Sequence, residues 1–289
     1  MFYSAANLFE KVDILKTTIE QADAIIIGAG SGLSTAAGLR YDEANFFTAA
    51  FPGYREHYGL RTINEADFYP FPTPEEQYAY WTRLISTIRY NHPPGKPYLD
   101  LHRIIRKKNY FILTTNTDGQ FQKAGFPLEK ICTPQGDLAF FQCSKPCTDE
   151  LYPNNQMIQK LLASLGPHDF SVKPEHIPRC PNCGNPLIPN IRRDNTFVEK
   201  PWIEQYQKLI ELINTHKGKN ILLLELGVGI NTPGIIRYPF EHLTLQRKNT
   251  FLVRANLKTD NLSLLANSDK ATIIQADIGP LLEELAKEY

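Results

Sequence analysis

The sequence predicts an α/β fold, in which a parallel sheet carries helices on both faces and a small inserted module bears cysteines. Five short apolar runs are separated by helical segments, and such runs suit parallel strands because these are buried on both sides. Four cysteines form two close pairs within one stretch of unusual composition. The 289 residues are enough for one large domain that carries a smaller module.

The N-terminal elements follow from the hydrophobic pattern. Apolar residues within 7–20 recur at spacings of four, three and four, which predicts an amphipathic helix. The run Ala24–Ile27 indicates a buried strand, the glycines after it indicate a tight turn, and Ser34–Leu39 indicates the start of a helix. Residues 41–81 are dense in aromatic side chains and lack a clear period, but a helix is expected from about 75 to 90.

The second half of the chain supplies the rest of the predicted sheet. Further strand candidates are 109–115, 220–227, 250–256 and 271–277, and residues 279–289 close the chain as a helix. The stretch 137–200 is rich in Pro, Asn, Cys and charged residues and poor in strand signal. We therefore expect it to be an inserted module, while residues 1–136 and 201–289 form the main domain.

Composition excludes some classes of partner. Lys and Arg together number 31, as do Asp and Glu, so the net charge is zero. This balance disfavours the strong electrostatic field of a protein that binds nucleic acid or an anionic membrane. Glu10 and Asp13 stand where a secretory signal needs a basic region and an apolar run, and no apolar run is long enough to span a bilayer. We expect a cytoplasmic protein.

The glycine turn at Gly28, Gly30 and Gly32 is a candidate phosphate site, because backbone amides and a helix N-terminus favour negative charge. A hydride-transferring dehydrogenase is disfavoured. Leu33 stands where the dinucleotide motif needs a further glycine, and no acidic residue ends a second strand at the required distance. A tight turn without a ligand is the alternative.

The four paired cysteines predict a structural metal site. Cys143 and Cys147 are separated by three residues, and Cys180 and Cys183 by two. Thiolates at such spacings converge on one tetrahedral zinc ion, and four of them leave no open coordination position. Reduced cysteines without a metal are the alternative. The fifth cysteine, Cys132, is expected to be a small buried hydrophobe.

Taken in order along the chain, these segments resemble the sirtuin family. GAGSGLSTAAGL from Gly28 is similar to the family's GAG motif, and TTNTD over Thr114–Asp118 is similar to its T-Q-N-x-D motif. PQGD at 134–137 occupies the place where a catalytic histidine precedes glycine. Leu226–Pro233 resembles a segment that contacts the cofactor. The resemblance implies a Rossmann-like fold that uses NAD and holds structural zinc.

Two departures from the family pattern carry information. The segment after the GAG motif reads Arg40, Tyr41, Asp42 and Glu43 instead of proline and Asp-Phe-Arg, so the residues that shield the nicotinamide end differ. The position of the catalytic histidine reads Gln135. A family deacylase uses that histidine as a base on the ribose hydroxyls, whereas a glutamine amide has no proton-accepting state near neutral pH.

The glutamine and the extended glycine loop resemble one branch, the macrodomain-linked class M sirtuins. This resemblance implies an NAD-dependent protein ADP-ribosyltransferase, whose acceptor is a lipoylated homologue of the glycine-cleavage H protein and whose mark a macrodomain hydrolase removes. Two alternatives stay open: a protein lysine deacylase, for which His92 or His102 would have to replace the base, and a non-catalytic NAD-binding sensor or scaffold.

The resemblance also implies the site residues. Asn116 and Asp118 are expected at the nicotinamide ribose with Gln135, and these three are the candidate catalytic residues. Gly227, Gly229 and Asn231 are expected at the adenosine half. The full set of expected cofactor-binding residues is Gly28, Ala29, Gly30, Ser31, Gly32, Leu33, Arg40, Tyr41, Asn116, Gln135, Gly227, Gly229, Asn231, Thr232, Asn256, Asp277 and Ile278.

Overall fold

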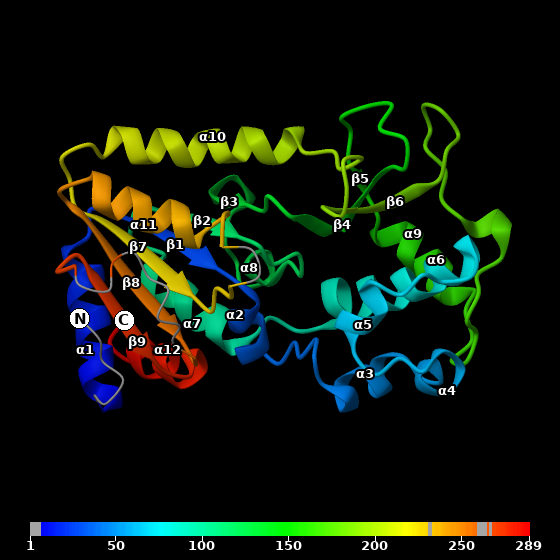
Figure 1. Ribbon diagram of the computed structural model, residues 1–289, viewed down its shortest axis with the longest axis horizontal. Coiled ribbons are helices and arrows are strands. Elements are labelled where there is room, and N and C mark those ends of the chain that lie inside the picture. The colour runs from blue at the N-terminus through cyan, green and yellow to red at the C-terminus, as the bar shows by residue number, and fades with distance from the viewer. Residues whose placement is uncertain (1–6, 231–232, 259–264, 266–267) are drawn as a thin grey trace.

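A six-stranded sheet, parallel throughout, forms the centre of the larger part of the molecule (Figure 1). The computed structural model describes residues 7–230, 233–258, 265 and 268–289. The strand order is β3-β2-β1-β7-β8-β9. The strands are β1 (Ala24–Ala29), β2 (Tyr110–Thr114), β3 (Ile131–Cys132), β7 (Ile221–Leu226), β8 (Thr250–Asn256) and β9 (Ala271–Gln275). The predicted α/β class is confirmed, and β3 is an addition, too short to leave a periodic signal.

Helices cover both faces of this sheet, and alternate strand residues point to each face. Ile25 and Ile27 pack in one apolar core with α1 (Leu8–Gln21), α2 (Ser31–Ala36), α7 (Lys96–Ile105) and α12 (Ile278–Ala286). Ile26 packs on the other face with α10 (Lys200–Thr215) and α11 (Arg237–Gln246). The strands are therefore continuously apolar because each of their two faces is buried in a separate core.

The helix ends show why several elements begin where they do. Asn7 caps α1 by accepting a hydrogen bond from the Glu10 amide at 2.9 Å, while Glu10 accepts one from the Asn7 amide. Thr73 caps α6 (Pro74–Leu84), which continues as the π-helix η1 (Ile85–Asn91). The helix expected over 75–90 is therefore correct in extent, but its second half has the wider π geometry.

The smaller part of the molecule is built around a three-stranded antiparallel sheet, β5-β4-β6 (Figure 1). Its strands are β4 (Gly136–Cys143), β5 (Tyr152–Pro153) and β6 (Leu187–Ile191). The strand signal of 137–200 is weak because buried polar residues such as Asp137 and Gln142 interrupt the apolar pattern of β4.

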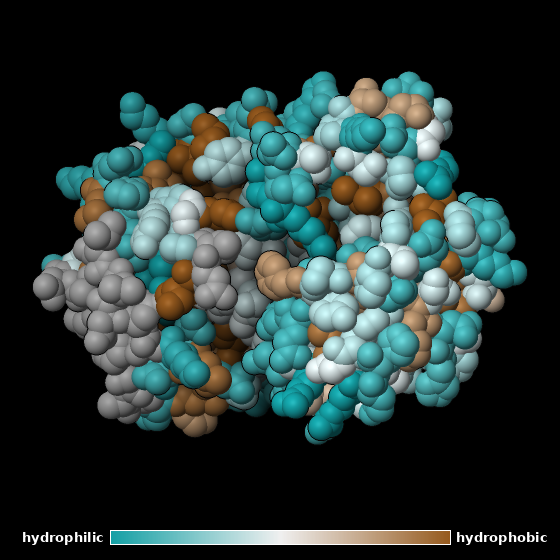
Figure 2. Space-filling model, turned by 45° about the vertical axis from the view of Figure 1, so that its right-hand side comes forward, coloured by the Kyte–Doolittle hydropathy of each residue, from teal (hydrophilic) through white to brown (hydrophobic). Residues whose placement is uncertain are grey.

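The aromatic-rich segment packs on this small sheet in one shared apolar core, which joins Phe47, Phe51 and Tyr54 to Phe141 and Leu187. The segment folds into short helices, α3 (Ala44–Ala50), α4 (Tyr54–Tyr58) and α5 (Ile63–Asp67), and α9 (Asn155–Ala163) packs against α6 and η1. Shorter elements are α8 (Gln120–Lys123), η2 (Leu128–Lys130) and η3 (Pro174–His176). Polar and charged side chains cover much of the face seen in Figure 2, with apolar ones scattered between them. Among the described residues, no helix is long and apolar enough to cross a membrane.

Candidate functional site

A cavity of about 800 Å³ opens at the carboxyl ends of the central strands. Strand β2 lies on one side of β1 and β7 on the other, so the direction of strand addition reverses at β1. Ligands of open α/β sheets bind at such a switch point. The volume suits a cofactor-sized ligand. The lining residues are Ser31, Gly32, Thr35, Ala36, Arg40, Val228, Gly229, Ile230, Asn256, Leu257, Lys258, Asp277, Ile278, Gly279 and Pro280.

Several residues expected at the cofactor meet in this cavity, although they come from four separate segments of the chain. Asp277 caps α12 by accepting a hydrogen bond from the Gly279 amide at 3.0 Å, so a helix N-terminus faces the cavity. The Asn256 side chain donates to Val228 O and accepts from the Leu257 amide. The predicted residues that line the cavity are Ser31, Gly32, Arg40, Gly229, Asn256, Asp277 and Ile278. Asn231 and Thr232 lie outside the described residues.

The glycine turn packs against the loop that follows β7, and this contact accounts for its glycines. A Cβ atom on Gly30 would lie 2.7 Å from Gly227 O, and one on Gly32 would lie 2.8 Å from Gly227 Cα. The amides of Gly30 and Gly32 donate to Leu226 O and Gly227 O. These two amides therefore already donate to protein carbonyls. The sequence pattern alone could not distinguish this role from phosphate binding.

Gly28, Ala29 and Leu33 do not present side chains to the cavity. A Cβ on Gly28 would meet Ile236 and Phe240 of the opposite layer, and Ala29 and Leu33 are fully buried in the core beneath α2. Any contact of these three residues with a cofactor is therefore restricted to their backbone atoms.

A buried polar cluster adjoins the glycine turn. Asp118, only 1% exposed, accepts hydrogen bonds from Ser34 Oγ at 2.5 Å and from the Gln120 amide at 2.9 Å. Asn116 Nδ2 donates to Gly30 O at 2.9 Å and to the Tyr98 hydroxyl at 3.1 Å. The Tyr41 hydroxyl lies 3.4 Å from Asp118 Oδ2. Burial raises the pKa of the Asp118 carboxyl, and the bond from Ser34 opposes that shift.

Sequence reasoning missed Ser34 and Tyr98, which orient this cluster. Both are fully buried, and Ser34 Oγ lies 2.9 Å from the Tyr98 hydroxyl. The sequence does not single out Ser34, because the same short helix also holds Ser31 and Thr35. No local signal marks Tyr98, because its place on α7 becomes adjacent to Asn116 only in the folded chain.

The turn that carries Gln135 lies against the Asn116–Asp118 segment. The Leu138 amide donates to Thr117 O at 3.0 Å, which places the start of β4 beside Thr117. Gly136 has φ of +96°, and a Cβ there would lie 1.9 Å from Asn190 O, so only glycine fits after Gln135. The Arg192 amide donates to Gln135 O at 3.0 Å.

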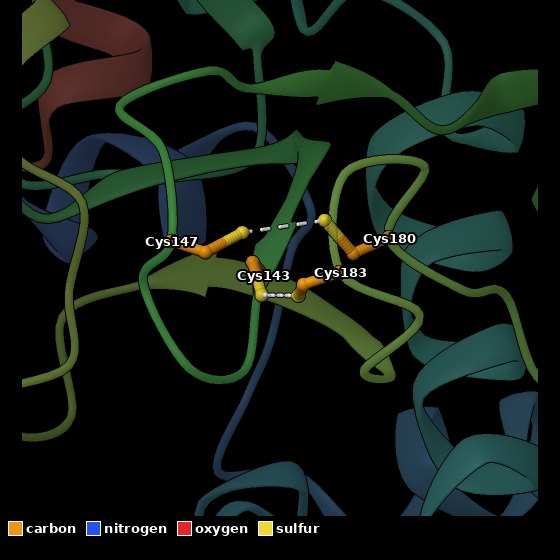
Figure 3. Close-up of side chains that lie close together, drawn as sticks. All are labelled: Cys143, Cys147, Cys180 and Cys183. Carbon is orange, nitrogen blue, oxygen red and sulfur yellow. Dashed lines mark hydrogen bonds between the residues drawn. The ribbon is translucent and has the colours of Figure 1, made fainter.

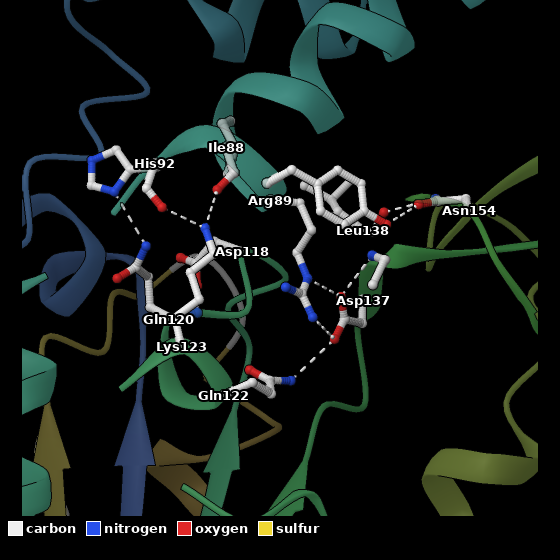
Figure 4. A network of polar contacts seen from close by, with 12 residues as sticks. Ile88, Arg89, His92, Asp118, Gln120, Gln122, Lys123, Asp137, Leu138 and Asn154 are labelled. Atoms are coloured by element: carbon white, nitrogen blue, oxygen red, sulfur yellow. Dashed lines mark hydrogen bonds and ion pairs between the residues drawn. The ribbon is translucent and has the colours of Figure 1, made fainter. Parts of the chain in front are cut away.

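The two histidines considered as replacement bases differ in position. His92 Nδ1 lies 3.2 Å from Gln120 Nε2, close to the segment that follows Asp118 (Figure 4). His102 lies on α7, edge-on to the Phe126 ring at 4.8 Å between centroids, and burial lowers its pKa. Of the two, only His92 lies near the polar cluster.

The four predicted metal ligands converge on one point (Figure 3). Cys143 Sγ lies 3.4 Å from Cys183 Sγ, Cys147 Sγ lies 3.6 Å from Cys180 Sγ, and all four sulfurs lie within 4.8 Å of one another. Sulfurs at about 2.3 Å from a tetrahedral zinc ion are about 3.8 Å apart, so the cluster fits zinc in a closed, structural site.

Two asparagines support this cluster from outside. Asn182 Nδ2 donates to Cys147 Sγ and Asn185 Nδ2 to Cys183 Sγ, each at 3.2 Å. The bond from Asn185 lowers the pKa of the Cys183 thiol to about 6, which favours the thiolate that zinc requires. Cys132 lies apart from the cluster, fully buried as predicted, and burial raises its pKa to about 12.

The chain is similar to two proteins of known description. It is 31% identical over 251 residues to a protein ADP-ribosyltransferase of Staphylococcus aureus (strain Mu50), covering 86% of this chain and 79% of that protein. It is 31% identical over 292 residues to a probable bifunctional ADP-ribose hydrolase/ADP-ribosyltransferase of Fusarium oxysporum f. sp. cubense, covering 94% of this chain but 48% of that protein. The chain thus spans about half of the bifunctional protein. No family model matches the chain.

Solved structures identify the fold. A structure described as the structural basis of sirtuin substrate affinity aligns with a TM-score of 0.63 and 19% identity, over 98% of this chain and 99% of that one. A complex of a Sir2 homologue with NAD aligns with a TM-score of 0.62 and 15% identity, over 100% of this chain and 95% of that one. The 31% identical relative shows that the chain belongs to its family of protein ADP-ribosyltransferases, and the solved structures show that its fold is that of the sirtuins.

Proposed function

We propose that the chain transfers ADP-ribose from NAD to a protein acceptor, and that this acceptor is a lipoylated carrier similar to the glycine-cleavage H protein. The observation that carries the proposal is Gln135. An amide, instead of a titrating base, stands in the turn that packs against the segment of Asn116 and Asp118. Transfer to a nucleophile does not require the base that deacylation requires.

NAD supplies the ADP-ribosyl group and nicotinamide as the leaving group. Asn116 is held by Gly30 O and the Tyr98 hydroxyl, so its side chain is fixed before the substrate arrives. Asp118 is buried, and its carboxylate would stabilise the positive charge that develops on the ribose. Gln135 would orient the ribose hydroxyls through hydrogen bonds of its amide.

The cavity would hold the rest of the cofactor. Ser31 and Gly32 would border the pyrophosphate at the start of α2, and Arg40 would lie beside them. Asp277 and Ile278 would contact the adenine at the start of α12, and Asn256 the adenosine ribose. The other proposed cofactor contacts are Gly28, Ala29, Gly30, Leu33, Tyr41, Gly227, Gly229, Asn231 and Thr232.

The proposal also covers domain organisation and partners. Residues 1–136 and 201–289 would form the NAD-binding domain, and 137–200 the inserted zinc module. The relative that is named for both ADP-ribose hydrolase and ADP-ribosyltransferase activity supports an association with a macrodomain hydrolase that reverses the mark. The reduced cysteine cluster suits the cytoplasm.

One incubation separates this function from its alternatives. The protein is mixed with NAD, the lipoylated carrier and an acyl-lysine peptide, and the products are weighed by mass spectrometry. A carrier that gains the mass of one ADP-ribose supports the proposal. Loss of the acyl group with an unchanged carrier would overturn it in favour of a deacylase, and the absence of nicotinamide release would favour an NAD sensor.

The role of Asn116 is tested by Asn116→Ala. Nicotinamide release and transfer should fall by at least ~100-fold, because the ribose loses the Asn116 amide oxygen, an acceptor that the two bonds donated by Nδ2 hold in place before binding. Asn249→Ala is the matched control, since Asn249 also donates to a glycine carbonyl, Gly218 O. Asn249 lies just before β8, at the amino ends of the strands and so at the end opposite the cavity. Near wild-type transfer by a folded Asn116→Ala protein would contradict the assignment.

A further inference from the structure

A buried ion pair lies at the junction between the segments that carry the proposed ribose-facing residues (Figure 4). Arg89 Nε donates to Asp137 Oδ1 at 2.7 Å, and Arg89 Nη2 to Oδ2 at 3.4 Å. Only 13% of the Arg89 side chain and 4% of the Asp137 side chain are exposed. Gln122 Nε2 and the Ala139 amide also donate to this carboxylate, at 3.1 and 2.7 Å. Four hydrogen bonds therefore hold Asp137.

Three segments far apart in the sequence meet at this pair. Arg89 comes from the π-helix η1, and Asp137 lies in β4, two residues after Gln135. The third segment follows Asp118: the Arg89 guanidinium lies against Gly119, where a Cβ atom would be 2.2 Å from Arg89 Cζ. Gly119 also has φ of +70°, so a side chain there is excluded by both conformation and contact.

A lysine holds the end of the π-helix in the same network. Lys123 Nζ donates to Ile88 O at 3.2 Å and to His92 O at 2.7 Å, the two carbonyls lying on either side of it in Figure 4. Lys123 belongs to α8, directly after the Asp118 segment. The π-helix is therefore tied to that segment on both sides of Arg89.

The Gln135 side chain itself makes no hydrogen bond within the part of the chain that the structure describes. Its position depends on the backbone around it: Gln135 O accepts from the Arg192 amide, and the Leu138 amide donates to Thr117 O. Asp137 is the one side chain within two residues of Gln135 that is buried and held by an oppositely charged partner. The ion pair is thus placed to set where the Gln135 turn lies relative to Asn116.

We propose that Arg89 and Asp137 are positioning residues for the transfer reaction, because their ion pair fixes the position of the Gln135 turn relative to the Asn116–Asp118 segment. This inference rests on the proposed function, in which both segments face the same ribose. Neither residue lines the adenosine cavity. Loss of the pair should therefore lower the rate of the chemical step and leave NAD binding nearly unchanged.

Stability alone is a weak explanation for such a pair. Removing one partner of a buried ion pair leaves an uncompensated charge and is strongly destabilising, but replacing both partners with apolar side chains of similar size is often neutral or stabilising. A pair that serves only the fold should therefore be replaceable as a unit. A pair that positions catalytic groups should not be, since a displacement of about 1 Å can cost ~100-fold in rate.

The test compares Arg89→Met with the double variant Arg89→Met/Asp137→Leu. Melting temperature, the Kd for NAD and the kcat of nicotinamide release are measured for both, and Lys96→Met is the control because it removes a cation from the largely buried Asp100 on α7. We expect the single variant to melt lower and the double variant to recover the wild-type melting temperature. We expect kcat to stay at least ~10-fold low in both, with Kd within about twofold of wild type.

A double variant that regains both its melting temperature and wild-type kcat would overturn the proposal, and so would a Kd that rises as much as kcat falls. Asp137→Asn, which keeps the size of the side chain and the oxygen that accepts from Arg89 Nε and the Ala139 amide, provides a second variant should Arg89→Met fail to fold. Wild-type transfer to the carrier tests the proposed function separately. The ratio of variant to wild-type nicotinamide release, with carrier or water as the acceptor, tests the ion pair.

Discussion

A single methyl group at Gly30 should open the wall of the cofactor cavity. The Cβ atom of Gly30→Ala would lie 2.7 Å from both Gly227 O and Val228 Cα, and both are backbone atoms that cannot rotate away. Since ordinary contacts begin near 3.4 Å, the glycine turn and the loop after β7 must separate by about 0.7 Å. Overpacking of this kind typically costs ~1–3 kcal/mol.

That free energy should appear mainly in cofactor binding. The free protein can relax by opening the two loops, but NAD binding must close them again, so the same cost is subtracted from the binding free energy. A cost of ~1–3 kcal/mol corresponds to a Kd for NAD that is about 5- to 150-fold weaker. The glycine turn also bonds the second loop through the Gly32 amide and Gly227 O, and this bond should weaken as the loops part.

Titration calorimetry with NAD, together with a thermal melt, measures both effects. Gly234→Ala is the control, because Gly234 lies in the same connection between β7 and α11 but a Cβ there would meet no atom within 4 Å. The control should bind NAD with wild-type affinity. If Gly30→Ala binds NAD as tightly as wild type and melts at the same temperature, the close approach of these loops does not shape the cavity and the reasoning is wrong.

Two further predictions concern the zinc cluster and the polar network. Asn185→Ala removes the hydrogen bond to Cys183 Sγ and should weaken zinc binding by ~10- to 100-fold in a chelator competition. The control is Asn195→Ala, which changes an exposed residue of the same module and should leave zinc binding unchanged. Equal zinc affinities of the two variants would contradict a supporting role for Asn185. Burial and the nearby charge of Arg89 lower the pKa of Lys123 to about 8, below its ordinary 10.5. Between pH 8 and 10.5, Lys123 is therefore protonated in the unfolded chain but largely neutral in the folded one. This difference makes the free energy of unfolding rise with pH over that range. Lys123→Met should flatten the rise in the free energy of unfolding between about pH 8 and pH 9.5, as measured by urea titration at each pH. An unchanged dependence of this free energy on pH would show that Lys123 is not responsible for the rise.

The strands and the metal ligands were predictable because their signals are local. Continuous apolar runs such as Ile221–Leu224 follow from burial on both faces, and cysteine spacing follows from the tight turns that a tetrahedral site needs. The β4–β6 sheet was missed for a related reason. Its strands carry buried polar residues such as Asp137 and Asn190, whose partners come from elsewhere in the chain, so no alternating apolar pattern marks them.

The sequence alone determined the α/β class and the cysteine cluster, because each depends on residue type at fixed short spacing, and its resemblance to the sirtuin family singled out the glutamine where a base is expected. Only the tertiary structure decided what these residues do to one another. It showed that the Gly30 and Gly32 amides bind the end of β7 and the loop after it, that Tyr98 holds Asn116, and that Arg89 reaches Asp137 across 48 positions. Such contacts are decided by packing between distant segments, which leaves no periodic trace in any one of them.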